Sequence, residues 1–306
     1  MIIRNFLFHR VSDKSDALWP PMHPELFERI IRFLTTRYDV VLLEKFLEDP
    51  TQFQHKKSIA TVLFDDGYKD NAEIAAPTLL RYKCPASFYV VTDCIDKGLP
   101  TWTYLTDHFF QTNTHTNIFL KEDFVPSSFR QIQWHSSEEG IQWGKKIKPW
   151  MKSLPNEQRL WVMEQFTKND GVKSFQDLMM NWKDVKQLYD NGFYIGSHSH
   201  THPMLGNLAS AKEINEELEI SAQRLQQHLG YRPITISYPI GSWDERVVKA
   251  AKDTGYKYGL AVEQKFYNNE IDDLFTIPRT ELYNESWLKT KLRINGVYQR
   301  IRKLVR

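Results

Sequence analysis

The chain has 306 residues, of which 41% are hydrophobic and 25% are charged, and its formal net charge is +2. This composition is that of an ordinary globular protein, and so small a net charge gives no indication of a general nucleic-acid-binding surface. No apolar run reaches the roughly eighteen residues that a membrane-spanning helix needs, so no such helix is expected.

The N-terminal segment, MIIRNFLFHRVSDKS, has a short apolar run but no small-residue cleavage site after it. It predicts a first core strand and not a signal peptide, and we expect a cytoplasmic protein. Apolar runs of strand length in the first hundred residues lie at 2–8, 40–43, 59–64 and 86–91. Apolar residues at helical spacing predict helices at 24–38, 43–48 and 72–82.

The two cysteines, Cys84 and Cys94, flank the strand-like run ASFYVV. An extended run of this length would hold them roughly 25–30 Å apart, at about 3.3 Å per residue. A disulfide requires Cα atoms within about 7 Å, so both are predicted to be free thiols.

Residues 98–180 interrupt the alternation and are rich in tryptophan and phenylalanine. We interpret them as an inserted helical excursion within a single domain that spans residues 1–306. The insertion could form a lid or a substrate wall, or it could be an extra packing layer, since aromatic residues mostly pack.

The second half returns to alternating strands and helices. Helices are predicted at 182–191, at 210–229, where Ser210 and Glu213 suggest a capping box, and at 244–254, with Asp244 as the N-cap. Strands are predicted at 193–196, 233–238, 256–262 and 275–278. About seven such units predict an α/β fold with a parallel sheet, closed or nearly closed into a barrel, whose chemistry would lie at the C-terminal strand ends.

Two adjacent carboxylates, Asp65 and Asp66, directly follow the apolar run IATVLF and precede Gly67. Carboxylates at the end of a buried strand are costly unless a cation neutralises them. An exposed Asp-Gly turn would be the alternative interpretation of this segment by itself.

Three histidines, His198, His200 and His202, also follow a predicted strand. Two imidazoles and one carboxylate would form a three-ligand set for a catalytic ion and leave one position open. The spacing allows His198 with His202, or a pair that includes His200. His9 ends the first predicted strand, and on a barrel it would share this rim.

These segments resemble the polysaccharide deacetylases of carbohydrate esterase family 4, the NodB homology family. FDDG at 64–67 is similar to the first family motif, HSHTH at 198–202 to the second, and SYPIG at 237–241 to the variant third motif of one branch. The resemblance covers about 1–95 and 181–280. It implies a distorted (β/α)7 barrel and metal-assisted hydrolysis.

By this resemblance, Asp66, His198 and His202 would bind the metal, Asp65 would be the general base, and His200 would be a bystander. Zinc is the expected ion, with cobalt, nickel or iron(II) as alternatives that the same donors suit.

The sequence departs from the common family pattern at two positions. Ser237 stands where an arginine usually holds the base, and no histidine follows His228 to act as the late acid. The resemblance to the biofilm-exopolysaccharide branch implies that His9 supplies the acid, and Arg279 is the candidate, by position only, for the missing arginine. Substrate contacts are expected from this region, at Tyr238, Ile240 and Arg279.

The predicted reaction is removal of an N-acetyl group from a sugar or polysaccharide, with release of acetate. O-acetyl ester hydrolysis, hydrolysis of a non-sugar amide, and a catalytically inactive glycan-binding role remain alternatives. The expected substrate is an N-acetylated glycan, or a lipid- or nucleotide-linked sugar.

The basic C-terminus, at about 286–306, predicts a helix that either contacts an anionic membrane surface or packs its apolar side on the barrel.

Overall fold

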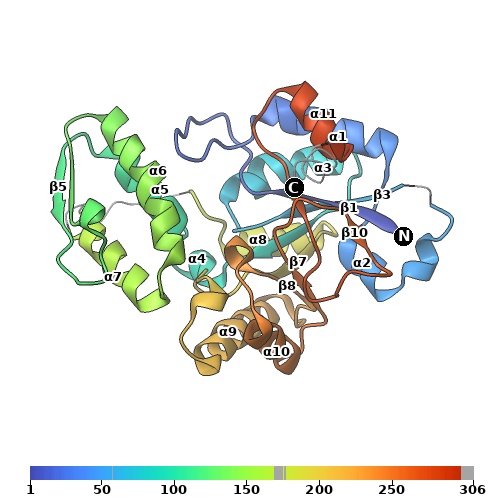
Figure 1. The fold of residues 1–306 in the computed structure, drawn as a ribbon. Coiled ribbons are helices and arrows are strands. Elements are labelled where there is room, and N and C mark those ends of the chain that lie inside the picture. The colour runs from blue at the N-terminus through green and yellow to red at the C-terminus, as the bar shows by residue number, and fades with distance from the viewer. Residues whose placement is uncertain (57, 169–174, 176, 298–306) are drawn as a thin grey trace.

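The computed structural model describes residues 1–56, 58–168, 175 and 177–297, and Figure 1 shows the fold. Its centre is a curled sheet in which six strands run parallel, in the order β1-β3-β4-β7-β8-β9. These strands are β1 (Ile2–Phe8), β3 (Ile59–Phe64), β4 (Ser87–Val90), β7 (Tyr194–Ser197), β8 (Thr235–Ser237) and β9 (Tyr258–Leu260). The short strand β2 (Asp39–Val40) pairs with β3.

The last part of the chain nearly closes this sheet into a barrel. Ile277 donates a backbone hydrogen bond to Gly259 of β9 and accepts one from Ala261, the residue after β9, both at 2.9 Å. Three residues later, β11 (Thr280–Glu281) pairs in parallel with the end of β1. One segment therefore bridges the two outer strands, and the expected distorted barrel is confirmed.

Helices cover the outside of the curled sheet. In Figure 1, α1 and α3 lie along one side, and α9 and α10 lie along the other. The helices around the barrel are α1 (Pro24–Arg37), α2 (Leu43–Glu48), α3 (Ala76–Arg81), α4 (Thr92–Lys97), α8 (Trp182–Asp190), α9 (Ala211–Leu229), α10 (Glu245–Thr254) and α11 (Trp287–Ile294). All six residues of β3 are buried, as expected of a parallel strand covered on both faces.

Several predicted elements need correction. The predicted strand at 275–278 is wrong: Ile277 forms only an isolated bridge to Leu260, and Pro278 has no N–H with which to continue a ladder. The structure instead has β11 and a short strand, β10 (Tyr267–Asn268), antiparallel to β1. The predicted helix at 72–82 begins as a π-helix, Asn71–Ala75, before α3. The strand expected at 40–43 ends at Val40, because α2 begins at Leu43.

The insertion at 98–180 forms a group of helices beside the sheet (Figure 1). It contains α5 (Trp102–Thr112), α6 (Ser137–Ser153) and α7 (Asn156–Thr167), and also a hairpin of β5 (Thr116–Phe119) and β6 (Gln131–Trp134) that was not predicted. These elements share a hydrophobic cluster of their own. Helices α5 and α6 pack closely at Gly140, where a Cβ would lie 2.5 Å from the carbonyl oxygen of Phe110.

Both cysteines are free and buried, as predicted. Among the described residues, no helix is both long and apolar enough to span a bilayer. The predicted C-terminal helix is present as α11 only up to Ile294, and its end at 298–306 lies outside the described residues.

Candidate active site

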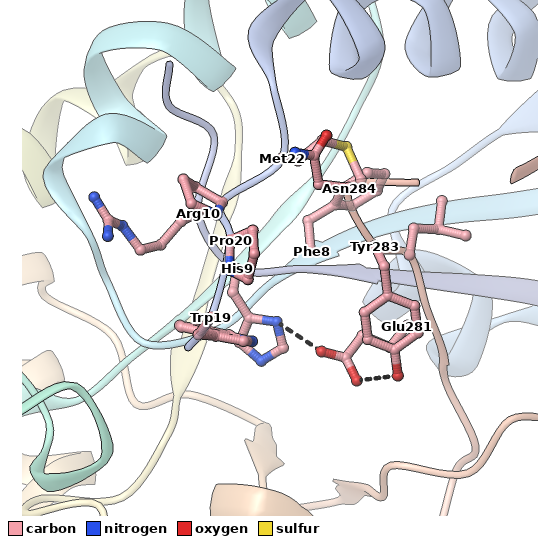
Figure 2. Close-up of a pocket in the computed structure, with 11 residues that line it drawn as sticks. Phe8, His9, Arg10, Trp19, Pro20, Met22, Glu281, Tyr283 and Asn284 are labelled. Atoms are coloured by element: carbon pink, nitrogen blue, oxygen red, sulfur yellow. Dashed lines mark hydrogen bonds and ion pairs between the residues drawn. The ribbon is translucent and has the colours of Figure 1, made fainter. Parts of the chain in front are cut away.

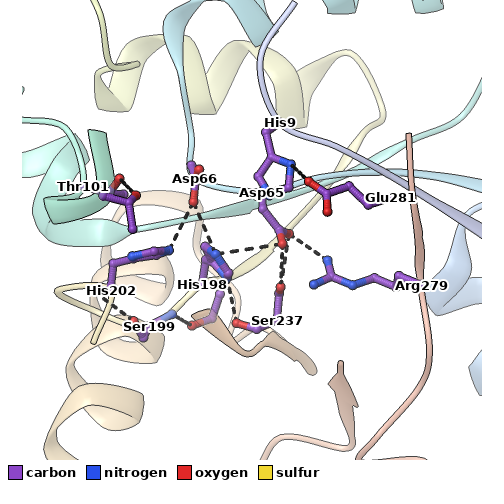
Figure 3. Close-up of polar contacts among 12 residues, drawn as sticks. His9, Asp65, Asp66, Thr101, His198, Ser199, His202, Ser237, Arg279 and Glu281 are labelled. Carbon is purple, nitrogen blue, oxygen red and sulfur yellow. Dashed lines mark hydrogen bonds and ion pairs between the residues drawn. The ribbon is translucent and has the colours of Figure 1, made fainter. Parts of the chain in front are cut away.

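The carboxylates and histidines that could bind a metal or transfer protons lie together at the C-terminal ends of three parallel strands (Figure 3). His9 follows β1, Asp65 and Asp66 follow β3, and the histidine loop follows β7. Parallel strands bring their carboxyl ends to one rim, so the fold joins residues that lie far apart in the sequence. They line a pocket of about 240 Å³. Its lining comprises His9, Trp19, Asp65, Asp66, Thr103, Asp107, Lys148, Lys152, His198, His202, Ile240, Val262 and Glu281.

Three of these residues could hold a metal ion. One ligand atom each from Asp66, His198 and His202 lies within 4.8 Å of the others, and all three side chains are buried. Asp66 Oδ1 is 3.3 Å from the Nε2 atom of each histidine. Burial raises the pKa of Asp66, but the contacts with His198 and His202 more than offset this and hold the pKa well below its usual value.

The geometry of His198 fits a ligand role. Its Nδ1 lies 2.8 Å from the carbonyl oxygen of Ser237, which can only accept, so Nδ1 carries the proton. This leaves the Nε2 lone pair directed at Asp66 and available to a cation. Two neutral imidazoles and a carboxylate form the donor set of catalytic zinc sites, so the residues present fit a divalent ion.

The backbone at this site is strained. Asp66, Ser199 and His202 have φ angles of 76°, 64° and 61°, a region that side chains other than glycine rarely adopt. Such strain persists only where surrounding contacts fix the conformation, and it concentrates at functional sites. Here Ser199 Oγ accepts a hydrogen bond from the His202 N–H at 3.1 Å, and Trp102 Nε1 donates to the His202 carbonyl at 3.1 Å.

Asp65 lies beside the ligand trio, with its Oδ2 atom 3.9 Å from His198 Nε2, and is held by Arg279 and Ser237 (Figure 3). Arg279 Nη1 donates to its Oδ1 at 2.8 Å, and Ser237 Oγ lies 3.1 Å from both carboxylate oxygens. Burial raises the pKa of Asp65, but Arg279 and then His198 outweigh it and lower the pKa below its usual value. The carboxylate is therefore charged at neutral pH and is oriented by two donors.

His9 enters the pocket from the other side and contacts Glu281. The His9 Nδ1 atom is 3.4 Å from Glu281 Oε1, and Trp19 packs edge-on against the imidazole at a centroid distance of 4.9 Å. Figure 2 shows these three residues bordering a second, smaller pocket of about 120 Å³. With Nδ1 turned to Glu281, the Nε2 atom of His9 is free to face a substrate.

The other predicted site residues lie in different places. Ile240 lines the pocket in a left-handed conformation, with a φ angle of 59°. Tyr238 does not: its side chain is fully buried in the hydrophobic cluster beneath α9 and α10. Arg279 is also fully buried and holds Asp65 without lining the pocket. His200 turns away, with Nδ1 at 2.9 Å from Thr92 Oγ1.

Sequence reasoning missed seven pocket residues: Trp19, Thr103, Asp107, Lys148, Lys152, Val262 and Glu281. Glu281 lies two residues after Arg279, so the alternation of a strand could have suggested it. Nothing in the sequence distinguishes Lys148 and Lys152 from the other lysines of α6.

Glu217 of α9 fixes the loop that carries the two ligand histidines. Its Oε2 accepts the N–H groups of His200 and Thr201 at 3.0 and 2.8 Å, and its Oε1 accepts the Thr201 hydroxyl at 2.5 Å. Residues that orient metal ligands typically contribute about 10–100-fold to metal affinity. We expect Glu217→Ala to weaken Zn²⁺ binding by about tenfold or more in competition with a chromophoric chelator. Glu216→Ala, a change at an exposed neighbour, is the control, and equal affinities for the two variants would refute this role.

Comparison with known proteins finds a matching family and related sequences. Residues 53–259 match the family described as polysaccharide deacetylase. Over 141 residues, the chain is 27% identical to a poly-beta-1,6-N-acetyl-D-glucosamine N-deacetylase of Staphylococcus aureus, covering 42% of this chain and 48% of that protein. The chain thus spans about half the length of the curated relatives it matches.

Solved structures share the fold across nearly the whole chain. The Streptococcus pyogenes deacetylase PplD, solved in complex with acetate, superposes with a TM-score of 0.64 at 16% identity, covering 96% of this chain and 98% of that one. A de-N-acetylase from Aggregatibacter actinomycetemcomitans gives 0.61 at 16% identity, with 96% and 100% coverage. At these identities the likeness extends to the fold alone.

Proposed function

Because the chain belongs to the polysaccharide deacetylase family, we propose that it is a metal-dependent hydrolase that removes an N-acetyl group from a glycan and releases acetate. One observation carries the proposal: a buried Asp66–His198–His202 trio lies beside an Asp65 carboxylate that Arg279 keeps charged. The S. aureus relatives are named for poly-β-1,6-N-acetyl-D-glucosamine, so polymers of N-acetylglucosamine are the first substrates to test.

The proposed mechanism assigns a step to each group. A divalent ion held by Asp66, His198 and His202 would supply Lewis acidity toward water and the acetamide carbonyl. Asp65 accepts a proton from the attacking water, while Arg279 and Ser237 hold the carboxylate in position. The water oxygen bonds to the carbonyl carbon, and a backbone N–H near Ile240, which lines the pocket, would stabilise the oxyanion.

His9 completes the proposed reaction. As the C–N bond breaks, His9 donates a proton from Nε2 to the leaving nitrogen, which therefore departs as an amine and not as an anion. Glu281, whose Oε1 atom lies 3.4 Å from Nδ1, positions the ring. The products are acetate and a free amino sugar. Zinc suits this donor set best, and cobalt, nickel or iron(II) would also fit.

The test is acetate release by the protein as purified, after chelation, and after Zn²⁺ is added back. The panel comprises N-acetylglucosamine oligomers, nucleotide- and lipid-linked N-acetylated sugars, and one aryl acetate ester. We expect release from a sugar amide that is lost on chelation and restored by metal. His198→Ala should lose both bound metal and activity, because it removes a ligand. His9→Ala should keep the metal and lose roughly 10²–10⁴-fold in kcat.

His200→Ala is the matched control, because His200 lies in the same loop but faces Thr92 and not the pocket. It should retain metal and most of the activity. Release from the ester alone would refute amide hydrolysis in favour of an esterase. A metal-loaded protein that binds glycans but releases nothing would instead indicate a binding protein.

A further inference from the structure

The wall of the pocket that faces the metal-ligand trio comes from the insertion and carries two lysines. Lys148 and Lys152 lie one turn apart on α6, and both line the pocket that contains Asp65 and His198. The mechanism above uses neither of them. Their position makes them candidates for contacts with the part of the substrate that does not react.

The two lysines differ in their partners. Lys148 Nζ forms an ion pair with Asp107 of α5, whose side chain is 3% exposed. Lys152 has no carboxylate within 4.0 Å among the described residues, and the charged groups that act on it from farther away include Lys148, Asp107 and Glu281. The Lys152 side chain is exposed within the pocket lining, so its ammonium group is accessible to an anionic ligand.

The other charged side chains of the pocket have closer partners of their own, including Glu281, whose Oε1 atom lies 3.4 Å from His9 Nδ1. Asp65 is neutralised by Arg279, and Lys148 by Asp107. The Asp66 carboxylate faces the two ligand histidines. Asp107 retains one buried oxygen with no hydrogen-bond partner among the described residues, so it could accept a donor such as a sugar hydroxyl.

The position of the lysines relative to the catalytic rim is fixed by packing. Helix α6 approaches α5 closely at Gly140 and also at Gly144, where a Cβ would lie 3.0 Å from the Phe110 Cβ. At the end of α6, Asn207 Nδ2 donates to the carbonyl oxygens of Lys152 and Leu154, at 3.2 and 2.9 Å. Asn207 follows the histidine loop by only a few residues. Lys152 is thus tied directly to the region that supplies the metal ligands.

We propose that Lys148 and Lys152 bind an anionic substituent, a carboxylate or a phosphate, on the sugar next to the one that is deacetylated. The inference rests on the proposed function and narrows its substrate to an acidic N-acetylated glycan. The ammonium group of lysine is a compact charge that suits carboxylate or phosphate oxygens without requiring a planar fork.

Binding measured by calorimetry tests this directly. The probes are a neutral N-acetylglucosamine tetrasaccharide, a tetrasaccharide that alternates N-acetylglucosamine with glucuronic acid, and a 6-phosphorylated N-acetylglucosamine tetrasaccharide. We expect at least one acidic probe to bind about tenfold more tightly than the neutral one, the size of a charge-assisted hydrogen bond. The acidic probe that binds more tightly shows whether the substituent is a carboxylate or a phosphate.

Variants of Lys152 show whether the tighter binding of acidic probes depends on the α6 side of the pocket. Lys152→Ala should abolish most of the preference, and Lys152→Glu should reverse it, while both bind the neutral probe like wild type. Lys145→Ala, on the same helix but outside the pocket lining, removes an equal charge and should keep the preference.

Binding and acetate release are scored separately. Equal binding of all three probes by wild type would overturn the inference, as would an equal loss for every probe in Lys152→Ala, whatever the hydrolysis assay shows. A lysine-dependent preference without any acetate release would uphold the anion site and refute the proposed hydrolysis.

Discussion

Replacing Asp65 by asparagine is expected to lower kcat for acetate release by roughly 10²–10⁴-fold while the protein keeps its metal. Asparagine has nearly the same shape and can still accept a hydrogen bond from Arg279 or Ser237, but it cannot take a proton from water. Asp65 is not among the three residues whose ligand atoms converge, so metal stoichiometry should not change.

Two measurements separate this role from that of a ligand. Metal content, determined by atomic absorption, should be the same for wild type and Asp65→Asn, whereas Asp66→Asn should lose metal. If Asp65→Asn also loses its metal, Asp65 is a ligand and the assignment of the base is wrong. Thermal unfolding of each variant shows whether lost activity reflects lost structure.

The second large effect is on stability. Arg279→Met should lower the free energy of unfolding by about 3–5 kcal/mol, because it leaves the buried Asp65 carboxylate without its cation. Urea denaturation measures this change. The double variant Asp65→Asn/Arg279→Met should recover much of the loss, since no unpaired charge then remains, and a double-mutant cycle gives the coupling.

A surface ion pair provides the control for Arg279. Arg81 lies 3.2 Å from Glu28, and its side chain is 59% exposed. Arg81→Met should change the free energy of unfolding by no more than about 1 kcal/mol, because water screens an exposed pair. Equal effects for the two arginine variants, or an additive double variant at 65 and 279, would show that the buried pair contributes no special stability.

The sequence predicted the barrel strands well because their apolar runs are continuous and end in unusual residues. The run before Asp65 is the clearest example: β3 has the predicted bounds, and every one of its residues is buried. Short strands were harder to predict. Both β10 and β11 have two residues each, too few for any periodicity to emerge, and they exist because β1 offers backbone partners along its edge.

The residues of the candidate site also differ in how well the sequence predicts them. Asp66, His198 and His202 lie in compact motifs, and the structure brings them together. Arg279 was chosen by position alone, and its contact with Asp65 depends on the segment that bridges β9 and β1. Tyr238 shows the limit of motif reasoning, because its neighbour Ile240 reaches the pocket whereas Tyr238 packs beneath the helices. The lysines of α6 gave no sequence signal, since only the packing of the insertion turns them toward the rim.

The bridging segment that carries Arg279 and Glu281 also sets the order in which the site can be completed. During synthesis, Asp65 leaves the ribosome 214 residues before its arginine partner. At about 5–20 residues per second, roughly ten to forty seconds pass in which β3 has no counter-ion for its carboxylate. Until the bridge arrives, the end of β1 lacks its neighbour β11 and His9 lacks Glu281. A nascent chain should therefore remain inactive and open to solvent at this rim, and the barrel would close and the active site become complete in the same late event.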